Sequence, residues 1–183
     1  MSATFPTSQR SKRGYDQSEV DEFLQRAREA YGQDPAAPPL LVAQDIRHVA
    51  FSLRRHGYST DHVDAALERL EDAFALRERE RSVDAVGAKE WLHDARATAQ
   101  VLLNRLNRPE GERFKRVNFL ARGYSRKDVD ALSERLVAYF QEGKPLSVDR
   151  VRTAVFRNQW AGYNESQVDA VLDSVVDVML AVR

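Results

Sequence analysis

The chain has 183 residues, of which 43% are hydrophobic and 31% charged, and it has a formal net charge of zero and no cysteine. This composition is typical of a soluble globular protein with one good core or two small ones, and a nucleic-acid binder would carry a basic excess. Disulfides, zinc-thiolate sites and thiol catalysis are excluded because there is no thiol.

The N-terminal segment 1–13 is polar and resembles no signal peptide. No apolar run approaches the roughly 18–20 residues that span a bilayer. We therefore expect a cytoplasmic protein that is at most peripheral on a membrane.

One motif recurs four times along the chain. Each copy is a Gly-Tyr dipeptide followed by Val-Asp, with the valine six residues after the glycine, and this fixed frame identifies an internal repeat. The structural motif residues are Gly14, Tyr15, Val20, Asp21, Gly57, Tyr58, Val63, Asp64, Gly123, Tyr124, Val129, Asp130, Gly162, Tyr163, Val168 and Asp169.

Each motif encodes the start of a helix. The residue after Gly-Tyr is a good N-cap in every copy, and an apolar stripe at helical spacing follows it. The third residue after the cap suits a reciprocal capping box in three copies, whereas His62 fits poorly. We predict helices over about 17–31, from about 60, over about 126–141 and over about 165–182.

The motif glycine supplies either a positive φ or a close backbone approach, and the tyrosine is placed to staple the incoming chain to the first helical turn. The four motif aspartates invite the hypothesis of a carboxylate site. The plainer interpretation is a favourable charge near a helix N-terminus, or a partner for an upstream arginine.

Between the motifs, the prolines and glycines of 32–39 predict a linker, and 41–51 predicts a short helix over about 43–50. The charged run 77–81 is typical of a solvated helix end, with partner binding as the alternative. Residues 84–107 predict a helix with a packing seam, and the sequence leaves open whether it is broken between Ser82 and Gly87. The packing seam of the helix predicted over 84–107 consists of Leu92, Ala95, Ala99, Leu102 and Leu106. Residues 112–122 are expected to be a short helix or irregular.

Residues 146–156 align without gaps on 41–51, and both follow Leu-x4-(Ile/Val)-Arg-x3-Phe, which makes copies two and four alike. Copies one and three instead have Phe5 and Phe114, nine residues before the glycine. We therefore predict an all-α fold of two pseudo-symmetric motif pairs, 1–76 and 111–183, joined by a long central helix within 77–110 and forming one compact unit. The nearly all-apolar last helix is expected to be buried or in an oligomer interface.

The sequence shows no site chemistry. The four histidines have no metal-ligand spacing, no phosphate loop or nucleophile elbow occurs, and we predict neither an enzyme nor a bound cofactor or metal. A remote alternative is a helix-turn-helix DNA-binding module over 43–75, with Arg47, Arg54, Arg55 and His56 as its basic residues. The acidic start of its second helix argues against nucleic acid as a partner.

The stretch RGYDQSEVDEFL of copy one resembles the N-terminal domain of DivIVA, the bacterial cell-division and polar-growth scaffold, and four copies in register resemble the DivIVA-domain repeat proteins of actinobacteria. The resemblance implies a non-enzymatic adaptor that acts by protein–protein interaction at the inner membrane or a cell pole. The family pairs its domains between chains and continues into a long coiled coil, which this chain lacks. Pairing between copies within one chain, or self-association, is therefore expected.

The resemblance also implies membrane contact through the loop before Gly-Tyr, where the family carries a phenylalanine that inserts and an arginine that meets lipid head groups. No copy here carries both. A peripheral membrane tether is therefore the alternative function, and a core or interface position is the alternative for Trp160. The residues expected to contact a membrane or protein partner are Lys12, Arg13, Arg55, His56, Arg122 and Trp160.

Overall fold

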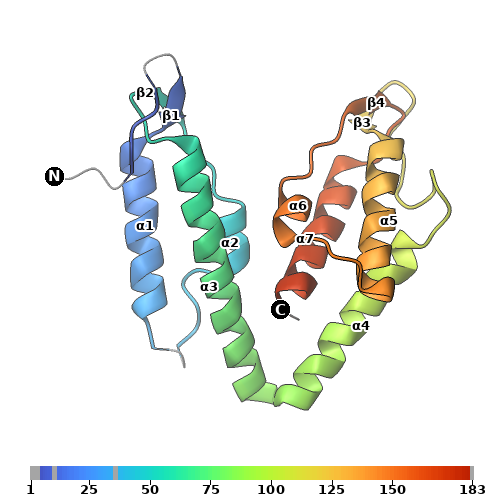
Figure 1. Ribbon diagram of the computed structural model, residues 1–183, viewed down its shortest axis with the longest axis horizontal. Helices are drawn as coiled ribbons and strands as arrows, with labels where there is room; N and C mark the ends of the chain where they lie inside the picture. Colours follow the sequence, from blue (N-terminus) through green and yellow to red (C-terminus); the bar gives the residue numbers. More distant parts are fainter. Residues whose placement is uncertain (1–4, 10–11, 35–36, 182–183) are drawn as a thin grey trace. The chain divides into compact units, whose positions relative to one another are not determined.

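The computed structural model describes residues 5–9, 12–34 and 37–181. The described residues form seven helices and four short strands (Figure 1). In chain order they are β1 (Arg13–Tyr15), α1 (Gln17–Gly32), α2 (Ala43–Arg47), β2 (Leu53–Arg55), α3 (Thr60–Val86), α4 (Ala88–Leu106), β3 (Arg122–Tyr124), α5 (Arg126–Glu142), α6 (Val148–Arg152), β4 (Asn158–Trp160) and α7 (Glu165–Ala181).

The chain divides into two compact units, residues 1–86 and 87–183, which we call unit 1 and unit 2. The boundary is Gly87, whose φ of 90° separates α3 from α4. The break that the sequence left open therefore falls at the C-terminal end of the window from Ser82 to Gly87. Residues 77–86 continue α3 in unit 1, and α4 belongs to unit 2, so no single helix spans the predicted connector 77–110.

The predicted helices are present and the fold is mainly helical, with two small two-stranded sheets that the all-α prediction did not include. In unit 1, β1 pairs antiparallel with β2, with Gly14 opposite Arg54. In unit 2, β3 pairs antiparallel with β4, with Gly123 opposite Gln159. The Gly-Tyr dipeptides of copies one and three therefore lie in β1 and β3, which pair with the chain before copies two and four.

Unit 1 has a core made by α1, α2 and α3. Phe23 of α1, Ile46 of α2 and Phe74 of α3 are all buried in one cluster, against which Val49 also packs. The predicted short helix is present, although α2 ends at Arg47 rather than near residue 50.

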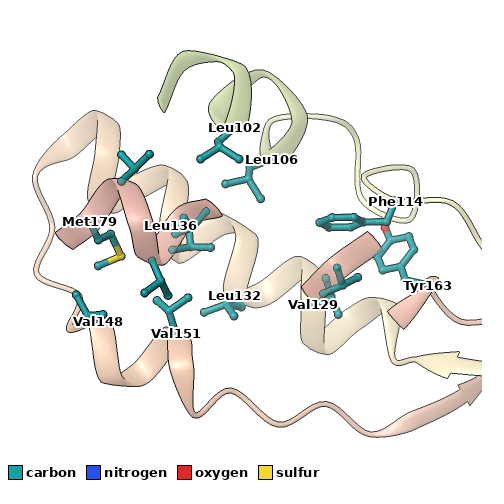
Figure 2. Packing of buried hydrophobic residues seen from close by; sticks show 14 residues of the cluster. Leu102, Leu106, Phe114, Val129, Leu132, Leu136, Val148, Val151, Tyr163 and Met179 are labelled. Atoms are coloured by element: carbon teal, nitrogen blue, oxygen red, sulfur yellow. The ribbon is translucent and has the colours of Figure 1, made fainter. Parts of the chain in front are cut away.

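Unit 2 has the larger cluster, to which α4, α5, α6 and α7 all contribute (Figure 2). Leu102 and Leu106 of the predicted seam are buried in it, whereas Leu92 is 36% exposed. Five residues of α7 are buried in the core of the unit, which confirms the expected burial of this helix. They are Val168, Val175, Val176, Val178 and Met179.

Candidate functional site

The two Gly-Tyr dipeptides of each unit lie against each other. In unit 1, a Cβ added to Gly14 would lie 2.1 Å from the carbonyl oxygen of Tyr58, and one added to Gly57 would lie 2.4 Å from that of Tyr15. No real Cβ tolerates such a separation from backbone. Positive φ occurs elsewhere among the described glycines, so close backbone approach is the reason for glycine in the motif.

Unit 2 repeats this contact. An added Cβ would lie 2.1 Å from the carbonyl oxygen of Tyr163 at Gly123, and 2.5 Å from that of Tyr124 at Gly162. The tyrosine backbones also exchange two hydrogen bonds in each unit, with N–O distances between 2.8 and 3.0 Å. Two motif copies therefore meet through backbone atoms in each unit.

Each motif tyrosine packs on the phenylalanine that leads into the other copy of its unit. In unit 1, Tyr58 meets Phe5 and Tyr15 meets Phe51, both at 5.4 Å between ring centroids. In unit 2, Tyr163 meets Phe114 at 5.3 Å and Tyr124 meets Phe156 at 5.1 Å. Most of these pairs are edge-to-face, a favourable arrangement for aromatic rings. The ring thus joins two copies, and in unit 1 Tyr58 also shares a buried cluster with Val63 of its own helix.

The motif aspartates accept hydrogen bonds from the tyrosines of the other copy. In unit 1, Tyr58 Oη donates to Asp21 at 3.1 Å, and Tyr15 makes the reciprocal bond to Asp64. In unit 2, Tyr163 Oη donates to Asp130 at 3.0 Å, while Tyr124 Oη lies 3.5 Å from Asp169. Each motif aspartate thus pairs with a tyrosine of the other copy in its unit, and the four carboxylates do not form one site.

Asp130 is the most enclosed of the four, with 5% of its surface exposed. It also accepts from the Gly111 N–H at 2.8 Å and lies 3.3 Å from Arg113, so the expected upstream arginine partner exists for this copy. Burial, followed by the hydrogen bond to Asp130, raises the pKa of Tyr163 to about 12. The hydroxyl therefore stays protonated and keeps donating over the physiological range.

The predicted capping boxes are completed between copies as well. The N-cap Asp16 accepts from Ser18 and Glu19 N–H groups as expected. Glu19 does not reach back to its own cap, however, and instead accepts from Ser52 N–H at 2.7 Å, while Ser52 O accepts from Asp16 N–H. Asp128 with Arg157, and Gln167 with Lys115, repeat this exchange in unit 2.

This exchange of hydrogen bonds between copies explains why His62 occupies the capping-box position that it fits poorly. In the second copy, the corresponding lead-in residue is Pro6, whose carbonyl accepts from Ser59 N–H at 2.9 Å. Proline has no N–H, so no donor faces the third residue after the cap. Position 62 therefore needs no acceptor, and His62 lies 3.0 Å from Ser59 Oγ instead.

The residues before the glycines form one exposed group in unit 1. Arg13 lies directly opposite Arg55 in the β1–β2 register, Lys12 and His56 flank them, and all four are exposed. We call these four residues tip 1. Like charges directly opposite each other in a sheet are unfavourable, so tip 1 is suited to an anionic partner.

In unit 2, the residues before the motif glycines form an exposed group that is mainly apolar. Trp160 is 57% exposed, lies opposite Arg122 in the register, and has the Arg122 guanidinium 4.8 Å from its ring centroid. The structure thus brings together an aromatic and an arginine that the sequence places in different copies. The alternative of a core position for Trp160 is wrong.

Two further residues belong to this group. Phe119 and Leu120 are 73% and 72% exposed on the turn 118–121, which Ala161 N–H joins to the end of β4 by a bond to Ala121 O. We call Phe119, Leu120, Arg122 and Trp160 tip 2. The sequence reasoning missed the first two because it considered only the two positions before each glycine.

The charged run 77–81 has an intramolecular role. Arg77 donates to the carbonyls of Tyr31 and Gln33 at the end of α1, and Glu78 accepts from Ala43 N–H at the start of α2 at 2.6 Å. Cations at helix C-termini and carboxylates at N-termini are stabilising. The interpretation as a wholly solvated helix end was therefore wrong for these two residues.

The basic residues of the DNA-binding alternative are divided in the structure. Arg47 is nearly buried and forms an ion pair with Glu71 at 2.8 Å, and Arg54 donates to Asp16 at 3.1 Å. Arg55 and His56 belong to tip 1. A phosphate backbone could reach only part of the expected set.

Among the described residues, no cluster of His, Asp or Glu is arranged to hold a metal ion. None of the helices in the described ranges has the length and apolar character needed to cross a bilayer. Comparison of the chain with protein-family profiles, curated proteins and solved structures finds no match.

Proposed function

We propose that this chain is a non-enzymatic adaptor of the DivIVA-like kind, acting in bacterial cell division or polar growth by binding protein partners through its tips. The observation that carries the proposal is the position of the six predicted contact residues. All six are exposed, and the two strand ladders gather them into tip 1 and tip 2. The resemblance of the motif supplies the biological setting.

The contacts between copies support a related proposal about assembly. In this proposal the four motifs are a duplicated pair, and each unit forms within one chain the pairing that the family forms between chains. The support is the reciprocal exchange of tyrosine, phenylalanine and aspartate contacts in both units. It predicts that both units form fully in a monomer of 20.9 kDa.

A second candidate function is attachment to a membrane surface through tip 2. Phe119, Leu120 and Trp160 give it three large exposed apolar side chains, and Arg122 lies beside them. Apolar and aromatic groups bury in the lipid interface, and an arginine adds attraction to anionic head groups. Tip 1 lacks aromatic side chains, so this function is proposed for unit 2 alone.

The adaptor function is tested by pull-down from the native cells with quantification of division and polar-growth proteins. The double variant Arg13→Gln/Arg55→Gln removes the facing charges of tip 1 and is expected to lose those partners. The matched control Arg28→Gln/Arg69→Gln removes two exposed charges from the helices of the same unit. If the tip 1 variant and the control variant recover equal amounts of these partner proteins, the proposal for tip 1 is wrong.

Membrane attachment is tested by sedimentation with vesicles of anionic and of neutral lipid. Trp160→Ala and Phe119→Ser are each expected to reduce binding to anionic vesicles at least tenfold. Val155→Ser is the matched control, because Val155 is 92% exposed and lies outside tip 2. An unchanged emission spectrum of Trp160 in a Trp91→Phe background, with saturating anionic vesicles, would contradict this function.

A further inference from the structure

A surface cleft of about 520 Å³ lies on unit 2. Its walls are the first two turns of α5, the loop after α4 and the strand β4. This volume falls within the range of about 300–1,000 Å³ found for small-molecule sites. Its charged and polar lining consists of Glu110, Arg126, Lys127, Asp130, Glu134 and Gln159.

Two of the three acidic residues that line the cleft, Asp130 and Glu134, have partners of their own. Asp130 is bound by Tyr163 Oη, Gly111 N–H and Arg113. Glu134 lies 3.6 Å from Arg113, although its side chain stays 55% exposed. Arg113 therefore offsets much of the negative charge on this side of the cleft.

The basic groups are not offset in this way. Arg126 and Lys127 have no carboxylate within ion-pair distance among the described residues, and the Nε of Arg126 is buried without a hydrogen-bond partner in that part of the chain. Leaving a buried donor without an acceptor is unfavourable. A bound acceptor would remove that cost.

A second guanidinium approaches the same place. The position that a Cβ on Gly111 would take lies 3.4 Å from Arg116 Nη2 and 3.7 Å from Arg126 Nη1. Arg116 donates to Gly111 O through both Nε and Nη2, which fixes its guanidinium there. Both guanidinium groups thus lie near Gly111, and an anion bound there would be attracted by both.

The fold does not require these cations. Counted from Gly-Tyr, the residues of the first copy that correspond to Arg116, Arg126 and Lys127 are Thr7, Gln17 and Ser18. Unit 1 nevertheless makes the same glycine, tyrosine and aspartate contacts as unit 2. Arg126 and Lys127 in the cleft, and Arg116 beside it, are therefore additions specific to unit 2.

We propose that the cleft binds a small molecule through an oxyanion, a phosphate or carboxylate group held by Arg126 and Lys127 of its lining. Arg116, beside Gly111 at the edge of the cleft, adds positive charge. The side-chain Oε1 of Gln159 accepts a hydrogen bond from the backbone N–H of Arg126 at 3.0 Å. The NH₂ group of the same side chain is therefore a further donor at this wall of the cleft. Glu110 and Glu134 favour a ligand whose remaining part is neutral or cationic. A monoanionic or zwitterionic molecule fits this lining best.

The test is a titration of the full chain with sodium phosphate and, separately, with sodium acetate, at an ionic strength held constant with sodium chloride. The amide NMR signals of Gly111, Lys127 and Gln159 report on the cleft. Saturable shifts at millimolar concentration are expected for at least one of the two anions, and the stronger of the two identifies phosphate or carboxylate as the group.

Arg126→Gln is expected to weaken this binding about tenfold or more, since charge-assisted hydrogen bonds are lost. Arg135→Gln is the matched control, because Arg135 is exposed on the same helix and does not line the cleft. The exposed Lys127→Gln provides a second variant if Arg126→Gln fails to fold. Shifts that never saturate, an equal loss with Arg135→Gln, or unchanged affinity in both cleft variants would overturn the proposal.

Discussion

Units 1 and 2 make the same contacts where their motifs meet, but they bury different charges. Unit 1 encloses the ion pair of Arg47 and Glu71, and the residue of unit 2 that corresponds to Glu71 is Val176, which is buried in an apolar core. Unit 2 instead encloses Asp130 with Arg113, whereas the corresponding Asp21 is exposed. The shared contacts are thus compatible with different interiors.

The units differ in the same way outside. Tip 1 is basic and tip 2 is apolar, although both stand on a two-stranded ladder fixed by glycines that touch. The comparison teaches that the glycine contact is the constant part of the motif, while the residues around it are free to vary. Four experiments would break or sharpen this conclusion.

The largest effect is expected at the glycines. Gly14→Ala and Gly123→Ala each place a Cβ 2.1 Å from a tyrosine carbonyl oxygen, so each should cost its own unit about 3 kcal/mol or more of unfolding free energy. Urea unfolding, with amide exchange to assign the loss to a unit, measures this cost.

Gly32→Ala is the control, because an added Cβ there meets nothing within 4 Å. It should be neutral or stabilise unit 1 by up to about 1 kcal/mol. A motif variant as stable as this control would show that the two backbones can move apart at no cost.

The next effect concerns the buried ion pair. Glu71→Ala removes the carboxylate 2.8 Å from Arg47 and is expected to cost roughly 3–5 kcal/mol, because a buried guanidinium loses its compensation. Val176→Ala, at the corresponding position of unit 2, should cost only roughly 2 kcal/mol of lost burial.

Chemical denaturation of both variants measures this difference. The double variant Arg47→Met/Glu71→Val tests whether the pair itself is needed, and it should recover most of the loss. If Glu71→Ala costs no more than Val176→Ala, the charge in unit 1 is solvated more than its burial indicates.

A smaller effect is expected at the tyrosine hydroxyls. Tyr163→Phe should destabilise unit 2 by about 1–3 kcal/mol, because buried Asp130 loses a donor. Tyr58→Phe should cost less, since Asp21 is exposed to water. Thermal unfolding at neutral pH compares the two variants.

The pH dependence gives an independent check on this pair. The pKa of Tyr163 is about 12 in the folded chain against about 10 in an unfolded one, so its contribution is complete below pH 10 and is lost as the pH rises toward 12. The alkaline loss of stability should be smaller in Tyr163→Phe. An identical alkaline limb in wild type and variant would contradict this assignment.

The smallest effect is expected at an exposed ion pair. Hydrogen bonds from Arg157 lower the pKa of Asp128 to about 2, so the stability that this carboxylate contributes is present above about pH 4 and is lost as the pH falls toward 2. Asp128→Asn should flatten this part of the acid limb. Glu19, the corresponding residue of unit 1, accepts a hydrogen bond from Ser52 N–H and has no arginine in this place.

Much of the helical structure could be predicted because it is encoded locally. The N-caps Asp16, Ser125 and Asn164 accept the expected first-turn hydrogen bonds, and the apolar stripes lie in the cores. These signals depend on residues within a few positions of each other, which a single sequence contains in full.

The pairing between copies could not be predicted in the same way. Tyr15 and Asp64 lie far apart in the chain, and nothing in either motif states which copy supplies the partner. The positive φ of 60° at His56 and 49° at Ala161 was also unexpected, because the motif offers a glycine one residue later. That glycine is needed where two backbones touch, so the turn uses the preceding residue.

The candidate contact residues were found from the resemblance, but their grouping came from the strand register. Arg122 and Trp160 belong to copies that looked incomplete when each was read alone. Phe119 and Leu120 gave a signal that could have been used, since two large apolar residues lie four and three positions before Gly123.

The short segments 33–42 and 143–147 have a consequence for how the protein behaves when it is scarce. Each connects two motif copies covalently, so that one copy meets the other at an effective concentration in the millimolar range or above. Pairing therefore follows first-order kinetics and does not depend on how many molecules a cell contains. A chain built in this way keeps both tips assembled at any dilution, whereas a scaffold that pairs between chains must first accumulate.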